Sequence, residues 1–432
     1  MKILMVGGGG REHAFAWKFA AERGVTEVLC APGNAGIARV ARCVAADAAD
    51  PASMLALVER EHVDLTVVGP ELPLDRGIVD LFASKGRPIF GPTRAAAQLE
   101  CSKVFAKAFM SRHGIPTARY RACETTTEAM AVITTGELGF PLVVKADGIA
   151  AGKGVVVAAD RSEAEAAVRA AMDDRQFGDA GARVVLEEGL SGPEISLFAI
   201  SDGRRAVSLA TAQDHKRVFD GDRGPNTGGM GAFAPSPLVD QGLEARVMRE
   251  IVEPVVASLR AEGNEYRGFL YVGLMLTCDG PKVIEFNVRF GDPEAQVVIP
   301  MIADELAPRL AAAAGGALDP APMNMRSERH VGVVLASQGY PRSGPTRLPI
   351  TGLDDASSVR DVLVFHAATA NESARDSGRV LTAGGRVLTV VGRGATYEDA
   401  IAKAYEGVSK ISFEGMQYRR DIGAKACFRS QS

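Results

Sequence analysis

Long apolar runs and paired cysteines are missing from this sequence. Its six cysteines are scattered between Cys30 and Cys427 without a Cys-x-x-Cys pair or metal-ligand spacing, which indicates a reducing compartment. No stretch reaches the roughly 20 apolar residues that span a bilayer. The first apolar run ends in glycines after Val6, too early for the core of a signal peptide. We therefore expect a cytoplasmic protein with no membrane partner.

An excess of positive charge is missing as well. The 432 residues include 49 lysines and arginines against 53 aspartates and glutamates, which gives a formal net charge of -4. Nucleic-acid binding depends largely on basic residues that displace counterions from the phosphates, and this chain has no excess of them. We therefore expect small molecules, not nucleic acid, as partners. The chain does have 47% hydrophobic residues, enough for the cores of about two to four domains.

The N-terminal part alternates short apolar runs with amphipathic stretches. Each apolar run leads into Gly or Pro, and Asp50 before Pro51 is typical of a helix start. This alternation predicts a doubly wound parallel sheet with its ligand crevice at the carboxyl ends of the strands. The predicted strands are residues 2–6, 27–31, 65–68 and 88–90, and the first predicted helix is 11–23.

Two predicted β-hairpins and an α+β segment follow. The first hairpin has a glycine-rich tip that we expect to be mobile, and the second turns at Asp279-Gly280. A Gly/Ala/Pro-rich linker after about Ala313 precedes the α+β segment. The predicted elements are a helix at 102–112, hairpin strands at 141–146 with 154–158 and at 269–277 with 282–288, strands at 331–336, 362–366 and 386–391, and a helix at 397–410.

The glycines at 7–10 imitate a dinucleotide motif without matching it. Counting the fingerprint from Gly7 places Glu12 where the last glycine belongs, and no acidic residue follows the second strand to bind a ribose. These departures argue against NAD and NADP. They leave open whether the turn binds a phosphate or serves only packing.

The segment from Gly148 to Gly154 imitates a P-loop but is one residue short and joins two strands. A glycine-rich hairpin with Lys145 and Lys153 is better interpreted as a flap that closes over ATP. Lys145 ends an apolar strand, where a phosphate partner would offset the cost of an unpaired charge. The alternative is a lysine that reaches to solvent.

The strand at 282–288 has two predicted faces. Ile284, Phe286 and Val288 alternate with Glu285, Asn287 and Arg289, so one face is expected in a core and the other in a site. Carboxylate and amide oxygens two residues apart suit Mg²⁺ bound to nucleotide phosphates. The alternative is a solvated strand face.

Glycine-rich and charged loops at 213–231 and 290–294 could bind a substrate phosphate or carboxylate through backbone N–H groups. A single histidine within them, His215, is interpreted as a structural hydrogen-bonding residue without a catalytic role.

Taken together, these segments closely resemble the glycinamide ribonucleotide synthetase family of ATP-grasp enzymes. Carbamoyl phosphate synthetase and biotin carboxylase share the architecture but not the whole set. Gly8 stands where relatives often carry Asn, so a side-chain amide is missing near the expected phosphoribosyl site. The motifs that carry the resemblance are residues 9–14, 31–36, 68–71, 145–154, 213–217, 224–232 and 285–294.

The resemblance implies three domains and a set of site residues. The domains are an N-terminal substrate-binding α/β domain at 1–101, an ATP-grasp domain at 102–325 with a lid at 118–190, and an α+β domain at 326–432. Arg289 and Lys145 are expected to be catalytic, and Glu285 and Asn287 to bind Mg²⁺ or Mn²⁺. The expected ATP contacts are Lys103, Lys145, Lys153, Glu187, Glu188 and Leu190; the expected substrate contacts are Gly8, Gly9, Gly10, Glu71, Asp214, Lys216, Gly229, Arg289 and Asp292.

The implied reaction joins glycine to phosphoribosylamine in purine synthesis. The glycine carboxylate would attack ATP to give glycyl phosphate, which the amine then attacks. We expect a monomer or a weak homo-oligomer. Alternatives are an ATP-grasp ligase for another carboxylate and a non-catalytic nucleotide-binding regulator.

Overall fold

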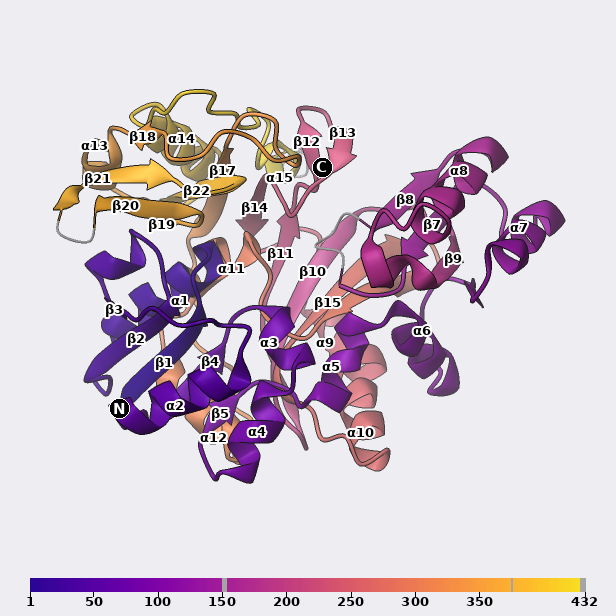
Figure 1. Cartoon of the computed structure of the whole chain (residues 1–432), viewed down its shortest axis with the longest axis horizontal. Helices are drawn as coiled ribbons and strands as arrows, with labels where there is room; N and C mark the ends of the chain where they lie inside the picture. Colours follow the sequence, from indigo (N-terminus) through magenta and orange to yellow (C-terminus); the bar gives the residue numbers. More distant parts are fainter. Residues whose placement is uncertain (150–153, 374–375, 428–432) are drawn as a thin grey trace.

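A computed structural model of the chain describes residues 1–149, 154–373 and 376–427. Figure 1 shows a body formed by two large sheets, with a small lid of strands and helices projecting from one side. Among the described residues, no helix is long and apolar enough to cross a membrane.

The N-terminal part is the predicted doubly wound unit. Its five parallel strands run in the order β3-β2-β1-β4-β5. The predicted cap at Asp50 is confirmed, because its carboxylate accepts the Ala52 N–H at 3.0 Å. The elements are β1 Lys2–Gly7, β2 Glu27–Pro32, β3 Arg42–Cys43, β4 Leu65–Val68, β5 Ile89–Phe90, α1 Gly10–Ala20, α2 Pro51–Glu61, α3 Glu71–Asp75, α4 Ile78–Ser84 and α5 Arg94–Cys101.

The lid is a four-stranded antiparallel sheet in the order β6-β9-β7-β8, with α7 and α8 packed on it. The predicted first hairpin is confirmed as β7 and β8, although residues 150–153 at its tip lie outside the described residues. Buried Leu142, Val144 and Leu186 belong to a separate hydrophobic core, so the lid is a packed unit of its own. The elements are β6 Tyr120–Cys123, α7 Thr126–Thr135, β7 Leu142–Ala146, β8 Val155–Ala158, α8 Arg161–Met172 and β9 Val184–Glu188.

An eight-stranded sheet connects the middle of the chain to its C-terminal part. The order is β16-β15-β10-β11-β14-β17-β22-β19, and β14 pairs with β17 across the predicted linker. The sequence did not predict β10, β11 and β14. The strands are β10 Glu194–Asp202, β11 Ala206–Asp214, β14 Gly231–Ala234, β15 Arg267–Thr277, β16 Gly280–Asn287, β17 Arg329–Ala336, β19 Val362–His366 and β22 Arg386–Gly394.

Shorter elements complete the fold. Two small sheets are β12 Arg217–Phe219 with β13 Arg223–Asn226, and β18 Pro349–Ile350 with β21 Asp376–Thr382 and β20 Thr369–Ser373. The remaining helices are α6 Lys103–Arg112, α9 Gln241–Val247, α10 Glu253–Ala261, α11 Glu294–Val298, α12 Leu306–Ala314, α13 Leu353–Ser358, α14 Tyr397–Val408 and α15 Ala424–Cys427, with a π-helical turn at Met248–Val252 and single 3₁₀ turns at Ile37–Arg39, Gly178–Ala182 and Ile299–Met301.

The predicted alternation along the second hairpin is wrong at one position. Gly273 pairs with Glu285 while the next residue, Leu274, pairs with Val283, so Ile284 is the extra residue of a β-bulge. Val283, Phe286 and Val288 are buried, whereas Ile284 is only half-buried. The bulge re-aims the strand just before Glu285 and leaves the carbonyl of Ile284 free to accept a hydrogen bond from the site.

Candidate active site

One buried carboxylate links two lysines beneath the lid. Glu187 on β9 lies 2.9 Å from the Nζ of Lys145 through one oxygen and 2.8 Å from the Nζ of Lys107 through the other. Lys145 also donates to the carbonyl of Ile284 at 2.8 Å. The side chain of Lys145 is therefore buried against the long sheet, and the alternative of a lysine reaching to solvent is wrong.

Lys107, which the sequence analysis did not select, is also buried in this cluster. It donates to Thr117 Oγ1 at 2.8 Å, and burial lowers the pKa of its ammonium group to about 8 although Glu187 acts to raise it. In the sequence, Lys107 is one of two lysines in an amphipathic helix, and no local signal distinguishes it from a surface lysine.

Lys103 lies where α6 meets the base of the flap. Its Nζ donates to the carbonyl of Gly148 at 2.8 Å, and burial lowers its pKa. Beside it, Asp147 accepts from Ser102 Oγ at 2.9 Å and from Val104 N–H at 3.1 Å, and pairs with Arg183 at 2.6 Å. These bonds tie the flap to the start of α6.

The other three expected ATP contacts differ in their surroundings. Glu188 lies on the opposite face of β9 from Glu187, and its carboxylate pairs with Arg119 at 2.6 Å. Leu190 is half-buried just beyond the strand. Lys153 lies outside the described residues.

Glu285 faces a cluster of positive charge. Its carboxylate lies 3.4 Å from the Nζ of Lys216, which also pairs with Glu194 at 3.0 Å. Lys216, followed by Lys145 and Lys103, lowers the pKa of Glu285 and keeps it ionised. Burial acts to lower the pKa of Lys216, but the surrounding carboxylates raise it well above its ordinary value.

Arg289 follows Asn287 and is fixed by two carboxylates. Its guanidinium pairs with Glu100 at 2.8 Å and with Glu71 at 3.3 Å, and donates to Asn287 Oδ1 at 3.3 Å. Glu100 also accepts the Val288 N–H at 2.7 Å. Glu71 comes from the N-terminal part, Glu100 from α5 and Arg289 from the end of β16, so three distant segments meet here.

Two further carboxyl groups, those of Asp214 and Glu294, lie within electrostatic reach of Lys216. Burial, and then the charge of the other group, raises the pKa of Glu294 on α11; burial likewise raises that of Asp214 at the end of β11. Asp214 was an expected substrate contact, whereas Glu294 was not selected. Its place in the Asp-Pro-Glu turn was visible in the sequence, but its burial was not.

Asp292 and the loop around Gly229 are joined by Arg386 from the C-terminal part. Arg386 lies 3.5 Å from the Asp292 carboxylate and donates to the carbonyls of Asp292, at 2.6 Å, and of Gly228. Gly229 N–H donates to Thr227 Oγ1 at 3.0 Å. The sequence analysis missed Arg386, because strand pairing far along the chain brings it here.

The first glycine-rich turn is filled by protein atoms. Gly9 N–H donates to Glu12 at 2.5 Å, and a Cβ at Gly8 would lie 2.5 Å from the carbonyl oxygen of Gly33. A Cβ at Gly10 would overlap the amide of Gln296. Close packing therefore favours glycine at 8 and 10, and a phosphate bound to the backbone of the turn would add a second reason for it.

His215 does not form the side-chain hydrogen bonds predicted for it. Its backbone N–H donates to Gly231 O at 2.9 Å, but its two ring nitrogens have no hydrogen-bond partner among the described residues. Burial lowers its pKa to about 3, so the ring is neutral. It packs at the edge of Phe233, with 5.9 Å between the ring centroids.

No group of three or more His, Cys, Asp or Glu side chains is arranged to hold a metal ion within residues 1–149, 154–373 and 376–427. Glu285 and Asn287 nevertheless fit Mg²⁺, because this ion often takes only one or two protein ligands and completes its shell with phosphate oxygens and water.

Comparisons with known proteins agree along the whole chain. Residues 1–100, 101–295 and 330–425 match the N, ATP-grasp and C domain models of phosphoribosylglycinamide synthetase. The phosphoribosylamine–glycine ligase of Xylella fastidiosa (strain Temecula1) is 51% identical with all of both chains covered, and that of Xanthomonas axonopodis pv. citri is 52% identical over 100% of this chain and 99% of its own.

Solved structures show the same fold. The phosphoribosylamine–glycine ligase of Thermotoga maritima superimposes with a TM-score of 0.83 at 35% identity, covering 98% of this chain and 100% of its own. Biotin carboxylase from Campylobacter jejuni, at 16% identity, a TM-score of 0.74 and coverage of 98% and 94%, shares the fold alone.

A lid that carries a buried lysine, over a long antiparallel sheet that carries a carboxylate–amide pair, defines an ATP-grasp enzyme. Within that class, the chain belongs to the phosphoribosylglycinamide synthetase family. It is accordingly a carbon–nitrogen ligase of purine biosynthesis. The predicted resemblance and fold class are confirmed, and the alternative of a non-catalytic regulator is wrong.

Proposed function

We propose that glycyl phosphate is the intermediate through which this chain ligates glycine to 5-phosphoribosylamine with ATP, giving glycinamide ribonucleotide, ADP and phosphate. The carbon of a carboxylate is a poor electrophile. When a glycine carboxylate oxygen attacks the γ-phosphorus of ATP, ADP leaves, and the acyl carbon then carries phosphate as a leaving group. The amine then attacks the acyl carbon and releases phosphate. The observation that carries the proposal is the cluster of Lys103, Lys145 and Lys216 around Glu285, since phosphoryl transfer depends on fixed positive charge.

The nucleotide is placed between the lid and the long sheet. Lys103 and Lys145 contact its phosphates, Lys153 joins them from the flap, and Glu187, Glu188 and Leu190 line the adenosine. The ion pair between Lys145 and Glu187 orients the ammonium group before the nucleotide binds. Closure of the flap excludes water from two labile compounds, glycyl phosphate and phosphoribosylamine.

Glu285 and Asn287 would hold Mg²⁺ or Mn²⁺. When bound, the ion neutralises charge between the phosphates of the nucleotide. Arg289 adds a guanidinium beside Asn287 that Glu100 and Glu71 hold in place. We assign the catalytic roles to Arg289 and Lys145, because carboxylates hold both cations beside the residues assigned to the metal and the phosphates.

The two other substrates are assigned to neighbouring regions. A buried pair of carboxyl groups with raised pKa values, Asp214 and Glu294, suits the ammonium group of glycine, because a bound cation would favour their charged forms. Phosphoribosylamine is placed toward the first glycine-rich turn. The proposed substrate contacts are Gly8, Gly9, Gly10, Glu71, Asp214, Lys216, Gly229, Arg289 and Asp292.

Isotope transfer tests the intermediate. With glycine labelled by ¹⁸O in its carboxylate, formation of glycyl phosphate moves one labelled oxygen into the released phosphate. Mass spectrometry of that phosphate should therefore find the label. Unlabelled phosphate released in step with glycinamide ribonucleotide would overturn the proposal.

We further propose domain boundaries at 101/102 and 325/326, a lid at 118–190, a cytoplasmic location and a monomer or weak homo-oligomer. Limited proteolysis that cuts near these boundaries and sedimentation that finds one copy per particle would support them.

A further inference from the structure

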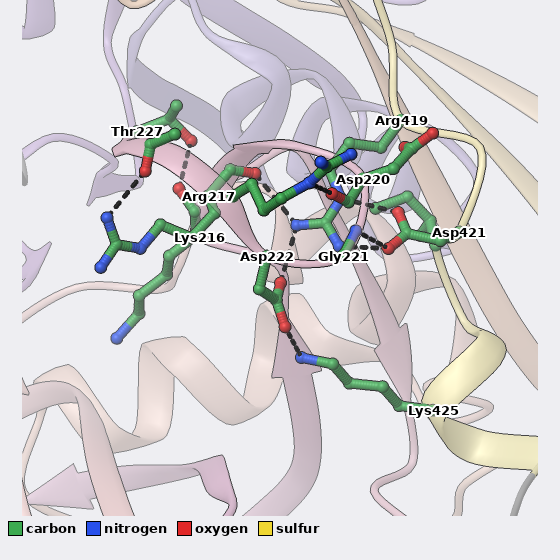
Figure 2. A network of polar contacts seen from close by, with 12 residues as sticks. Lys216, Arg217, Asp220, Gly221, Asp222, Thr227, Arg419, Asp421 and Lys425 are labelled. Atoms are coloured by element: carbon green, nitrogen blue, oxygen red, sulfur yellow. Dashed lines mark hydrogen bonds and ion pairs between the residues drawn. The ribbon is translucent and has the colours of Figure 1, made fainter.

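A buried arginine near the C-terminus holds the loop that carries Lys216. Arg419 is 1% exposed, and its guanidinium donates to Asp421 through Nε at 2.8 Å and Nη2 at 2.6 Å. Its Nη1 donates to the carbonyl of Arg217 at 3.0 Å and to Asp222 at 2.8 Å. Figure 2 shows these groups converging from the β12–β13 hairpin and the C-terminal segment.

The C-terminal segment 419–425 makes three more contacts with residues 220–222 at the tip of the β12–β13 hairpin. Asp421 accepts the Gly221 N–H at 2.9 Å, Asp220 accepts the Arg420 N–H at 2.8 Å, and Lys425 pairs with Asp222 at 2.5 Å. Three carboxylates and two cations therefore hold residues 220–222 against residues 419–425 (Figure 2).

Arg419 contacts the residue next to Lys216 in the chain. Arg217, whose carbonyl it holds, directly follows Lys216. The carbonyl of Lys216 accepts from both the N–H and the hydroxyl of Thr227, each at 2.8 Å. The backbone of Lys216 is thus fixed on both sides, while its ammonium group lies between Glu194 and Glu285.

Gly228, at the other end of the segment that begins with Lys216, also contacts the C-terminal part. Gly228 N–H donates to the hydroxyl of Tyr340 at 3.0 Å, and its carbonyl accepts from Arg386. Arg386 also contacts Asp292. Both ends of the segment 216–228 are therefore positioned by residues beyond 329.

We propose that Arg419 is a positioning residue for the ligase reaction, acting through Arg217 to set Lys216 against Glu285. A buried guanidinium with two carboxylates contributes little net stability, because desolvation offsets much of the Coulomb attraction. Its planar fork does fix geometry, since four directed bonds join three separate points of the chain. Arg419 thereby links the C-terminal part to the reaction without itself touching substrate.

Arg419→Lys tests this inference, because an ammonium group keeps the charge but cannot reach Asp421, Asp222 and the Arg217 carbonyl together. We expect the KM for glycine to rise about tenfold, because Lys216 is a proposed substrate contact beside Asp214, which we assign to the ammonium group of glycine. Small misplacements near a site have effects of this order. The KM for ATP should stay within about twofold. Arg420→Lys is the matched control at the exposed neighbouring position and should leave both constants unchanged.

A folded Arg419→Lys protein with an unchanged KM for glycine would overturn the proposal, as would equal rises for glycine and ATP. Thermal unfolding of the same samples establishes that each protein is folded. If Arg419→Lys does not fold, Asp222→Asn is the second variant. It weakens the contacts of Asp222 with both Arg419 and Lys425 and should shift the same constant in the same direction; no shift would again count against the proposal.

The inference rests on the proposed place of Lys216 in the site, which Lys216→Ala tests separately. Full activity of Lys216→Ala would remove that assignment. Loss of activity in Lys216→Ala beside a normal Arg419→Lys would overturn the positioning role alone.

Discussion

At the scale of residues, neighbouring charges in the site fix the ionisation state of Glu285 and the orientation of Lys145. Lys216, Lys145 and Lys103 hold the pKa of Glu285 below its ordinary range, and Glu187 orients Lys145. The result is an ionised Glu285 beside an Asn287 whose amide oxygen accepts from Arg289. Hard oxygen ligands and fixed cations thus lie together where phosphates are expected.

Glu285→Gln is expected to lower kcat by about 10²- to 10³-fold, because it removes a charged group that contributes only when the phosphates react. The side chain is 42% exposed, so the midpoint of thermal unfolding should change little. ADP release measures the first effect and calorimetry the second. Lys282→Gln, a charge change elsewhere on β16, is the control; turnover of Glu285→Gln equal to that of the control would remove the metal assignment.

At the scale of elements, the hairpin of β7 and β8 combines a rigid base with a glycine at its turn. Lys145 and Asp147 anchor the base, whereas Gly148 has φ +149° and a Cβ there would lie 2.7 Å from the Cβ of Ala180. A side chain would therefore need the flap to move away from the turn at Gly178–Ala182.

Gly148→Ala should raise the KM for ATP about tenfold, since displacement of the Gly148 carbonyl also displaces Lys103. Initial-rate kinetics with ATP varied provide the measurement. Gly136→Ala is the matched control, because Gly136 has φ +67° in the lid but open space around it. It should cost about 1 kcal/mol of stability without changing the KM for ATP. The same KM in both variants would show that the flap base does not position Lys103.

At the scale of the whole molecule, the N-terminal and C-terminal parts meet through neutral histidines. His13 Nδ1 on α1 accepts the His366 N–H of β19 at 2.8 Å, and Asn34 donates to the carbonyls of Gly8 and His366. Burial and the other histidine lower the pKa of His13 to about 3, and burial lowers that of His366 to about 4. The contact therefore needs both rings uncharged.

Stability should fall as the pH drops from 6.5 toward 4. Over this range the unfolded chain binds protons at these histidines while the folded chain does not, so acid favours unfolding. Each neutral buried histidine contributes a slope of about 1.4 kcal/mol per pH unit. His13→Asn keeps an acceptor for the His366 N–H but does not titrate. Its unfolding temperature should fall less steeply with acid than that of the parent, and parallel curves would contradict the assignment.

Much of the site was visible in the sequence, and the missing part has a common cause. Lys145, Glu285 and Asn287 stand out because local alternation places a polar side chain on an otherwise apolar strand. Lys107, Arg386 and Arg419 resemble ordinary surface cations in their own segments. Their surroundings form only when segments that are distant in the chain pair or pack, and no local pattern encodes that.

The sequence by itself indicated the family through the resemblance of its motifs. It also determined the doubly wound N-terminal sheet, both hairpins and the strand that carries Glu285 and Asn287, because these elements follow from periodicity and turn chemistry within short windows. Only the tertiary structure decided the bulge at Ile284, the pairing of β14 with β17 and the gripping of the Lys216 loop by Arg419. These features depend on register and burial across the whole chain. The residues expected to bind could be selected from the sequence, whereas the residues that hold them in place could not.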